Sequence, residues 1–209
     1  VDEENVFYYL TLGNENYPMP DQPKGTNEGI LRGLYKFNEG KARLKHKVQI
    51  FGSGSILREA LKAQKLLENY GVSADIWSAT NYKRLRAEAL EVQRWNMLHP
   101  TKKPRKSYVE SVLEKEKGPF IAVSDNMRIV SEQINPWVPG GLFTLGTDGF
   151  GRSDTRENLR RFFEVDAECV VIGTLYRLSQ LGSIDSKVVE KAIQTLKVDP
   201  EKVYPILKG

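Results

Sequence analysis

A glycine-rich loop that runs into a helix holds the side chains best placed for chemistry. Asp148, Arg152 and Asp154 are interspersed with glycines in the stretch from Leu145 to Asp166, and residues 155–163 are predicted to form the helix. An arginine beside two carboxylates either forms a charge network that fixes the shape of the turn or contacts a ligand or partner. The second role stays open because α/β proteins place ligands at the carboxyl ends of strands.

A second glycine-containing loop, Gly52-Ser53-Gly54-Ser55, lies between a predicted strand and a predicted helix. Helix N-termini favour anions, so this turn is one candidate for binding phosphate. The dinucleotide-binding pattern requires a third glycine where Leu57 stands, and no Gly-Lys-Ser/Thr sequence marks a P-loop. A tight strand-to-helix turn with Ser55 as the helix N-cap accounts for both glycines and is favoured over a ligand site.

The histidines and the cysteine show no metal-site spacing. His46 and His99 are far apart in the sequence, and Cys169 is the only cysteine. We expect His46 to be solvated, Cys169 to be a core residue, and His99 to be a loop residue with a local hydrogen bond. A nucleophile–base–orienter set of the kind used in covalent catalysis is not assembled anywhere in the sequence.

The composition is that of an ordinary globular protein, with 40% hydrophobic and 28% charged residues among 209. No run of about 18 apolar residues is present, so no membrane span is expected. The chain does not begin with Met and shows no signal peptide, and we interpret it as part of a longer chain. A single cysteine allows no internal disulfide, which favours a cytoplasmic setting.

The net charge of +4 raises the question of nucleic-acid binding. The basic residues gather in the stretches 41–47 and 102–106, and neither stretch interleaves aromatic residues with the charges, as single-strand binders do. We interpret these stretches as solvated loops or as contacts with an acidic partner protein, in preference to a nucleic-acid site. We therefore expect no nucleic acid among the partners.

Short apolar strands alternate with helices from residue 30 onward, which is typical of a parallel sheet covered on both faces. Residues 1–29 are rich in turn formers and prolines, and we interpret them as a linker from an upstream domain that precedes a single domain at 30–209. The predicted strands are 33–37, 48–51, 74–77, 120–123 and 142–145. The predicted helices, with Asn81 and Asp154 or Thr155 as N-caps, are about 55–70, 81–95, 107–116, 127–134, 155–163, 167–181 and 186–196.

Four segments give the chain a family resemblance: Asn14-Glu15-Asn16-Tyr17 with Met19-Pro20, Gly52 to Arg58, Arg94 to Pro100, and Leu145 to Asp166. Together they resemble the C-terminal domain of the homodimeric, thiamine-diphosphate-dependent bacterial pyruvate dehydrogenases (acetyl-transferring). The resemblance implies a transketolase C-terminal-domain-like fold. That fold is a three-layer α/β/α sandwich on a five-stranded, mostly parallel sheet with one antiparallel strand.

The resemblance also implies a function for the whole enzyme. Such an enzyme works in the bacterial cytoplasm, in glycolysis and pyruvate metabolism, decarboxylating pyruvate and passing the acetyl unit to lipoyl groups of the dihydrolipoyl acetyltransferase component. By this resemblance, thiamine diphosphate and Mg²⁺ bind to the upstream domains through a Gly-Asp-Gly motif. Thr147-Asp148-Gly149 in this chain does not match that motif. This chain alone is therefore expected to bind no cofactor, to contain no catalytic residue and to be inert.

The implied role of the domain is structural, in contacts with upstream domains and with the homodimer partner. The candidate interface or active-site-facing residues are Asp148, Phe150, Arg152, Asp154 and His99. Apolar surface left exposed is expected around residues 7–10. The alternative is a regulatory module that binds an anion or another ligand at Gly52–Ser55 or Gly146–Gly151.

Overall fold

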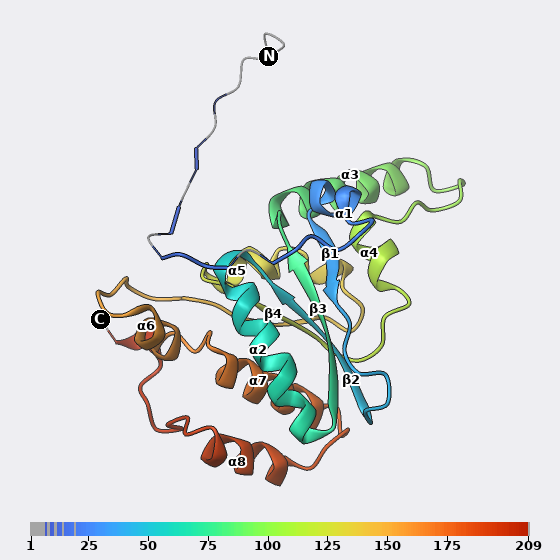
Figure 1. Ribbon diagram of the computed structural model, residues 1–209. Helices are drawn as coiled ribbons and strands as arrows, with labels where there is room; N and C mark the ends of the chain where they lie inside the picture. Colours follow the sequence, from blue (N-terminus) through green and yellow to red (C-terminus); the bar gives the residue numbers. More distant parts are fainter. Residues whose placement is uncertain (1–6, 8, 11, 14, 19, 209) are drawn as a thin grey trace.

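The computed structural model describes residues 7, 9–10, 12–13, 15–18 and 20–208 (Figure 1). In chain order its helices and strands are α1 (Asn27–Arg32), β1 (Leu34–Asn38), β2 (His46–Gly52), α2 (Leu57–Leu67), β3 (Val72–Ala79), α3 (Tyr82–Leu98), α4 (Tyr108–Leu113), β4 (Phe120–Val123), α5 (Arg128–Glu132), β5 (Leu142–Leu145), α6 (Arg156–Phe162), α7 (Ala167–Gln180) and α8 (Ser186–Thr195). Short 3-10 turns lie at Gly54–Ile56, Glu68–Tyr70, Asn135–Trp137 and Pro205–Leu207.

The strands of the described residues form one sheet in the order β1-β3-β2-β4-β5. β1 is antiparallel to β3, and the other neighbouring pairs are parallel. The register of β1 shifts between Lys36 and Asn38, which marks a bulge in this edge strand. All five strand predictions and the predicted antiparallel first strand are confirmed.

Two apolar cores lie on opposite faces of the sheet because strand side chains alternate between faces. One core joins Ile50 and Ile121 of the sheet to α2, α7 and α8. The other joins Phe51 and Phe120 to α3, α4 and α5. Figure 1 shows these helices in two layers around the strands, so the predicted three-layer sandwich is confirmed.

Several helix ends follow local side-chain chemistry. The predicted cap at Asn81 is confirmed, since its Oδ1 accepts a hydrogen bond from the Arg84 amide at 2.9 Å. Ser107 and Glu110 form a capping box that starts α4. Gly71, in the left-handed region at φ 70°, ends the helical stretch that begins with α2, as predicted. α3 continues three residues beyond its predicted end at Trp95.

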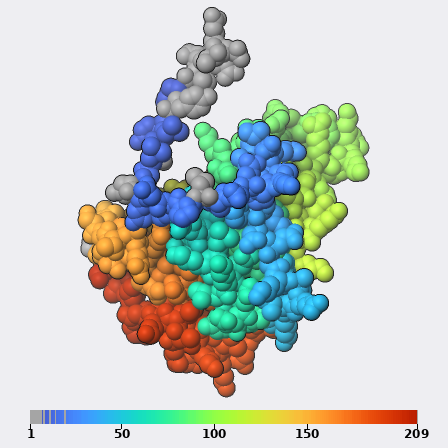
Figure 2. All heavy atoms as spheres, viewed as in Figure 1, coloured from blue at the N-terminus to red at the C-terminus, as the bar shows by residue number. Residues whose placement is uncertain are grey.

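The first described residues, Phe7, Tyr9 and Leu10, lie apart from the body of the domain (Figure 2). Phe7, Tyr9 and Leu10 are all strongly exposed, and Figure 2 shows the described residues here extending away from the body. Exposed apolar surface in this segment agrees with the prediction for residues 7–10, except for Tyr8, which lies outside the described residues. α1 begins at Asn27, before the predicted domain boundary at residue 30.

Candidate functional site

The carboxyl ends of β2, β4 and β5 bring three loops together. Ser55, after β2, donates its hydroxyl to Asp125 Oδ2 at 3.2 Å. Thr147, after β5, donates its hydroxyl to the Asp125 carbonyl at 2.8 Å and its amide to the Asn126 carbonyl at 2.9 Å. The loop after β4 therefore joins the two glycine loops that the sequence analysis treated separately.

Close backbone approaches require Gly52 and Gly146 in these loops. A Cβ on Gly52 would lie 2.8 Å from Leu57 Cα, and a Cβ on Gly146 would lie 2.6 Å from the Asn126 carbonyl oxygen. Gly54 has a φ of +55°, which favours glycine. The prediction of a tight strand-to-helix turn at Gly52–Ser55 is therefore confirmed.

The prediction that Ser55 caps the following helix is wrong. Ser55 lies inside the 3-10 turn Gly54–Ile56, and α2 begins at Leu57 with no side-chain cap. The Ser55 hydroxyl instead donates to Asp125, 70 residues later in the chain. The Ser55 side chain therefore makes a tertiary hydrogen bond where the local sequence pattern predicted a helix cap.

The predicted charge network among Asp148, Arg152 and Asp154 is also wrong. Asp148 pairs with Arg128 at the start of α5, with 2.9 Å between Oδ2 and Nε, and accepts the Arg128 amide at 3.3 Å. Arg152 lies over the Phe162 ring, 4.3 Å from its centroid, and forms no ion pair within the described chain. Arg128 follows the neighbouring strand β4, so the sequence around Asp148 does not show this partner.

Asp154 acts at the start of α6. Its Oδ1 accepts hydrogen bonds from the Asn158 side chain at 2.8 Å and the Thr155 amide at 2.6 Å, which together lower the pKa of the Asp154 carboxyl. Thr155 is the N-cap, accepting the Asn158 amide at 3.3 Å, so the predicted alternative of a Thr155 cap is confirmed. Arg152 and Asp154 both line a hollow of about 220 Å³ beside α6.

The C-terminal residues cover the glycine loop from outside. A Cβ on Gly149 would lie 3.0 Å from the Pro205 carbonyl oxygen, and Arg128 donates to the Tyr204 hydroxyl. Lys202 donates to the carbonyls of Arg161 and Phe162 at 3.0 and 2.8 Å. Phe150, in the same loop, remains 75% exposed. The sequence analysis missed this cover because nothing local links residues 202–207 to the loop.

Three of the four segments that carry the family resemblance meet around Tyr17. Arg58 lies 4.6 Å from the centroid of the Tyr17 ring, and Arg160 donates to the Tyr17 hydroxyl at 3.1 Å. Arg160 also pairs with the buried Glu59 at 3.2 Å, and Glu59 accepts the Ala167 amide at 3.2 Å. These contacts tie the N-terminal segment to α2 and α6, so these residues position the carboxyl edge of the sheet.

His99 lies apart from this cluster. Its ring stacks on Trp95 with centroids 4.4 Å apart, and its Nδ1 is 2.8 Å from the Trp95 carbonyl oxygen. Arg105 covers the same Trp95 ring at 3.7 Å. The prediction of a locally hydrogen-bonded histidine is confirmed. Figure 1 shows the end of α3, where His99 follows, on the other side of the molecule from α6.

The described residues support neither a reaction at Cys169 nor a metal site. Cys169 is buried at the start of α7, and burial together with the nearby Asp166 carboxylate raises the pKa of its thiol. The prediction of a core cysteine is confirmed. Across the described ranges, no three His, Cys, Asp or Glu residues are grouped so that they could hold a metal ion. None of the described helices is both long and apolar enough to span a membrane.

Comparison with known proteins decides the family. The model of the transketolase-like TK C-terminal domain family matches residues 33–166. The chain belongs to this family. The matched residues run from the start of β1 to the N-cap of α7, so they include the sheet, both glycine loops and the Glu59–Arg160 pair.

Curated relatives of this transketolase-like domain carry one name. The Pyruvate dehydrogenase E1 component of Pseudomonas aeruginosa is 49% identical over 98% of this chain and 24% of its own length. The Escherichia coli K12 protein of the same name is 47% identical over 98% of this chain and 23% of its own length. The chain therefore spans about a quarter of the length of these relatives and matches their C-terminal portion.

Solved structures agree on the fold. A transketolase from Pichia stipitis in complex with sedoheptulose 7-phosphate has a TM-score of 0.52, is 20% identical, and is matched over 80% of this chain and 21% of its own. Transketolase from Leishmania mexicana has a TM-score of 0.50 and 19% identity over 80% of this chain and 22% of its own. At such identities the likeness concerns the fold of the transketolase-like domain.

Proposed function

We propose that this chain is the interface-forming C-terminal domain of a homodimeric bacterial pyruvate dehydrogenase. The near-complete match to two pyruvate dehydrogenase E1 components supports this assignment. In this proposal the whole enzyme acts in the cytoplasm after glycolysis, decarboxylates pyruvate with thiamine diphosphate and Mg²⁺, and passes the acetyl unit to the dihydrolipoyl acetyltransferase component. Residues 1–29 link the domain to the upstream part of the enzyme.

The residues of this chain do not fit a site for thiamine diphosphate and Mg²⁺. Asp148, in Thr147-Asp148-Gly149, is the acidic residue nearest to a cofactor-type motif. One of its carboxylate oxygens forms an ion pair with the Arg128 guanidinium, and the other accepts a hydrogen bond from the Arg128 amide. Mg²⁺ requires carboxylate or water oxygens in near-octahedral geometry, and a guanidinium group already contacts this carboxylate. We assign the cofactor to the part of the enzyme outside this chain.

An apolar hollow between α3 and α5 is the observation that carries the interface role. It measures about 760 Å³, and its lining includes Leu90, Ile129, Val130, Pro136 and Trp137. Leu90 is 39% and Ile129 is 60% exposed. Exposed apolar patches of this kind mark interaction surfaces in folded proteins.

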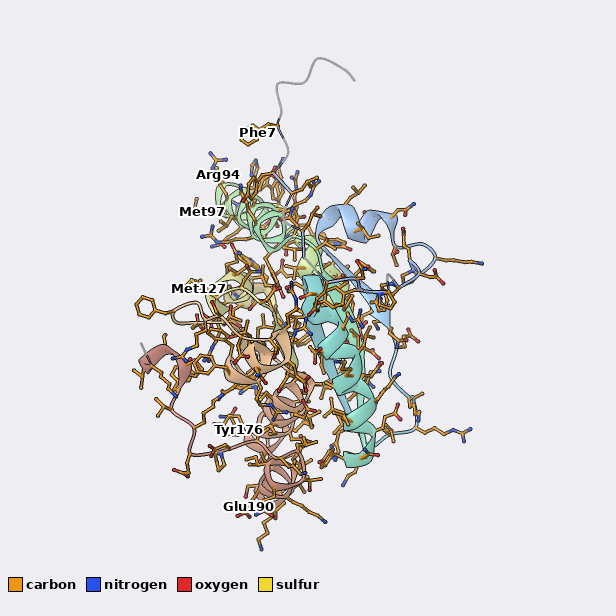
Figure 3. All side chains as sticks on the ribbon, turned by 60° about the vertical axis from the view of Figure 1, so that its left-hand side comes forward. Phe7, Arg94, Met97, Met127, Tyr176 and Glu190 are labelled. Carbon is orange, nitrogen blue, oxygen red and sulfur yellow. The ribbon has the colours of Figure 1, made fainter. Side chains whose placement is uncertain are left out.

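The same side of the molecule carries further apolar side chains. Met97 near the end of α3 and Met127 before α5 are both largely exposed, and Figure 3 shows them along one side with Arg94. We propose that the upstream part of the same enzyme chain covers this surface. The E1 relatives supply such a part, since this chain spans only about a quarter of their length.

Calorimetry tests the inert-domain proposal. Thiamine diphosphate with Mg²⁺ is titrated into this chain, with the full-length Pseudomonas aeruginosa E1 component as the control. No Mg²⁺-dependent binding with this chain and Mg²⁺-dependent, saturable binding in the control are the expected results. Mg²⁺-dependent binding by this chain alone, or turnover of pyruvate by it, would mean that the cofactor has been assigned to the wrong part of the enzyme.

A substitution in the hollow tests the interface. Ile129→Asp should weaken association of the chain with the remainder of the E1 component, supplied as a separate polypeptide, by at least about tenfold, because it replaces an apolar contact with a charge that must lose its hydration. Leu31→Asp on α1 is the matched control, since Leu31 is 70% exposed and lies outside the hollow. Equal association of both variants would contradict the proposed surface.

One observation favours a second function, binding of a ligand at Gly52–Ser55. The Ser53 hydroxyl is buried and has no hydrogen-bond partner among the described residues. A buried hydroxyl without a partner costs free energy that a ligand could recover. Thermal melting with phosphates and pyruvate tests this function: a stabilisation that Ser53→Ala abolishes supports it, and no shift with any anion rejects it. Arg152→Ala gives the same test for the Gly146–Gly151 loop.

A further inference from the structure

The amino ends of β2, β4 and β5 surround a second hollow, on the edge of the sheet opposite the glycine loops. It measures about 370 Å³ and is lined by the segments 45–47, 117–119 and 139–140, and by residues at the end of α7. In Figure 1 the amino end of β2 lies at the lower end of the sheet. Small-molecule sites have volumes of about 300–1,000 Å³, so this hollow is at the lower end of that range.

The hollow is lined by basic side chains, and none of the described residues that line it is acidic. Lys45, His46, Lys47, Lys117 and Arg177 all contribute to it. Lys47 is neutralised by Asp75, which lies outside the lining. In the described chain Lys45 and Lys117 have no ion pair, and Arg177 donates only to the Gly140 carbonyl and the Gln180 side chain, each at 3.3 Å. Three cations are therefore left without a compensating carboxylate.

The shape of the hollow is fixed by its backbone. Gly118 has a φ of +87°, and a Cβ there would lie 1.7 Å from the Lys47 carbonyl oxygen. The Gln49 amide donates to the Pro119 carbonyl at 2.9 Å, so the loop before β4 is held against the start of β2. The hydrogen bond from Arg177 to Gly140 ties α7 to the loop before β5. The cations are thus arranged on connected elements instead of on one free loop.

The titration of His46 agrees with an excess of positive charge. Burial lowers the pKa of its imidazole, and the nearby Lys45 ammonium lowers it further. Lys47 and Lys117 line the same hollow, and the carboxylate of Asp75 is paired with Lys47. An anion bound among these groups would reverse the effect, because it would stabilise the imidazolium form.

We propose that this hollow binds a small molecule through a diphosphate group. The guanidinium of Arg177 offers the planar donors that phosphate oxygens accept in pairs, and Lys45 and Lys117 add two ammonium charges. Three uncompensated cations match the charge of a diphosphate better than that of a single phosphate. The site is separate from the glycine loops and from the α3–α5 hollow, and it does not depend on the proposed enzyme function.

The two histidines make the test specific. Inorganic pyrophosphate is titrated into the chain while the imidazole signals of His46 and His99 are followed by NMR across pH. The pKa of His46 should rise, whereas His99, which stacks on Trp95 at the end of α3, should not change. Inorganic phosphate should bind more weakly than pyrophosphate. No shift of His46 at millimolar pyrophosphate would overturn the proposal.

Variants separate a built site from general electrostatic attraction. Lys117→Ala and Arg177→Ala should each weaken pyrophosphate binding about tenfold, as expected for a charge-assisted contact. Lys117 is exposed, so its removal leaves the packing intact. Lys102→Ala, in the other basic stretch, should leave the affinity unchanged. Equal losses in all three variants would show non-specific attraction, and unchanged affinity in the two pocket variants would show that the cations only compensate the carboxyl end of α7.

Discussion

At the carboxyl edge of the sheet the charged side chains are mostly paired within the chain, whereas at the amino edge several cations are not. Asp148 pairs with Arg128, and Glu59 pairs with Arg160, so each pair joins two segments of the carboxyl edge. At the amino edge Asp75 pairs with Lys47 and Lys36, Lys36 also pairs with Glu116, and no carboxylate among the described residues lines the hollow.

The difference teaches that the glycine loops and the basic hollow use polar groups in different ways. Internal pairs at the carboxyl edge fix loops that would otherwise be free to move, and they leave little charge for an outside ligand. Unpaired cations at the amino edge add little to the stability of the fold, since exposed charges contribute little. They maintain a positive electrostatic potential that attracts anions.

Gly118→Ala should have the largest effect and would test how firmly the amino edge is built. Its φ of +87° is strained for alanine, and the added Cβ would meet the Lys47 carbonyl oxygen. We expect the free energy of unfolding to fall by about 3–5 kcal/mol, from backbone strain and overpacking together. Urea unfolding is the measurement. Gly140→Ala, with φ +71° and no atom within 4 Å, should lose only about 1–2 kcal/mol.

Asp75→Asn should have the next largest effect, because this carboxylate pairs with Lys47 in β2 and with Lys36 in β1. The side chain is 3% exposed and contacts Lys36 Nζ at 3.2 Å, Lys47, and the Gly40 amide at 2.8 Å. Loss of this charge should lower the free energy of unfolding at pH 7 by about 3 kcal/mol, the low end for a buried pair because both lysines are partly exposed. Asp199→Asn, at an exposed residue, should change it by less than about 0.5 kcal/mol.

The same variant should change the response to acid. Burial opposes the charged form of Asp75, but hydrogen bonds from Gly40, Lys47 and Lys36 outweigh it and lower the pKa of the carboxyl. The stability that this group contributes is complete above its unfolded-state pKa of about 3.9 and is lost as the pH falls through the lower folded-state pKa. Unfolding measured from about pH 5 to about pH 2 should show this loss in the parent chain, and a smaller one in Asp75→Asn.

Asp148→Asn should have the smallest effect and would sharpen the contrast at the carboxyl edge. The amide can still accept from Arg128, but the ion pair is lost, and we expect about 1–2 kcal/mol less stability. The Arg128 side chain is 34% exposed, so water can solvate it. Hydrogen exchange should report faster opening of Gly146–Gly151 than of β5. Unchanged exchange in this loop would show that the C-terminal cover holds it without Asp148.

The fold could be predicted from the sequence because its signals are local. Each strand is a short apolar run next to a turn former, and Asn81 and Gly71 act within one helical turn of themselves. The antiparallel β1 came from the family resemblance, and the strand order was not predicted, since apolar runs alone do not specify which strands are neighbours. Helix ends were less accurate, as at α3, which continues past Trp95 to Leu98.

The candidate site was predicted only in part, because its contacts link distant segments. Ser55 was assigned to a helix cap but bonds to Asp125, and Asp148 was grouped with Arg152 but pairs with Arg128. The amino-edge hollow was missed for the same reason. Its cations come from segments far apart in the sequence, and only the parallel arrangement of β2, β4 and β5 brings them to one place.

The two outer strands of the sheet, β1 and β5, have a consequence for handling the protein. β1, at one edge, is interrupted by the bulge between Lys36 and Asn38, and β5, at the other, has only four residues. Bulged, charged or very short edge strands are poor templates for pairing with a second molecule. The chain should therefore resist strand-to-strand polymerisation at the high concentrations that the NMR titration needs. The surfaces available for self-association are the apolar one between α3 and α5 and the exposed residues Phe7, Tyr9 and Leu10.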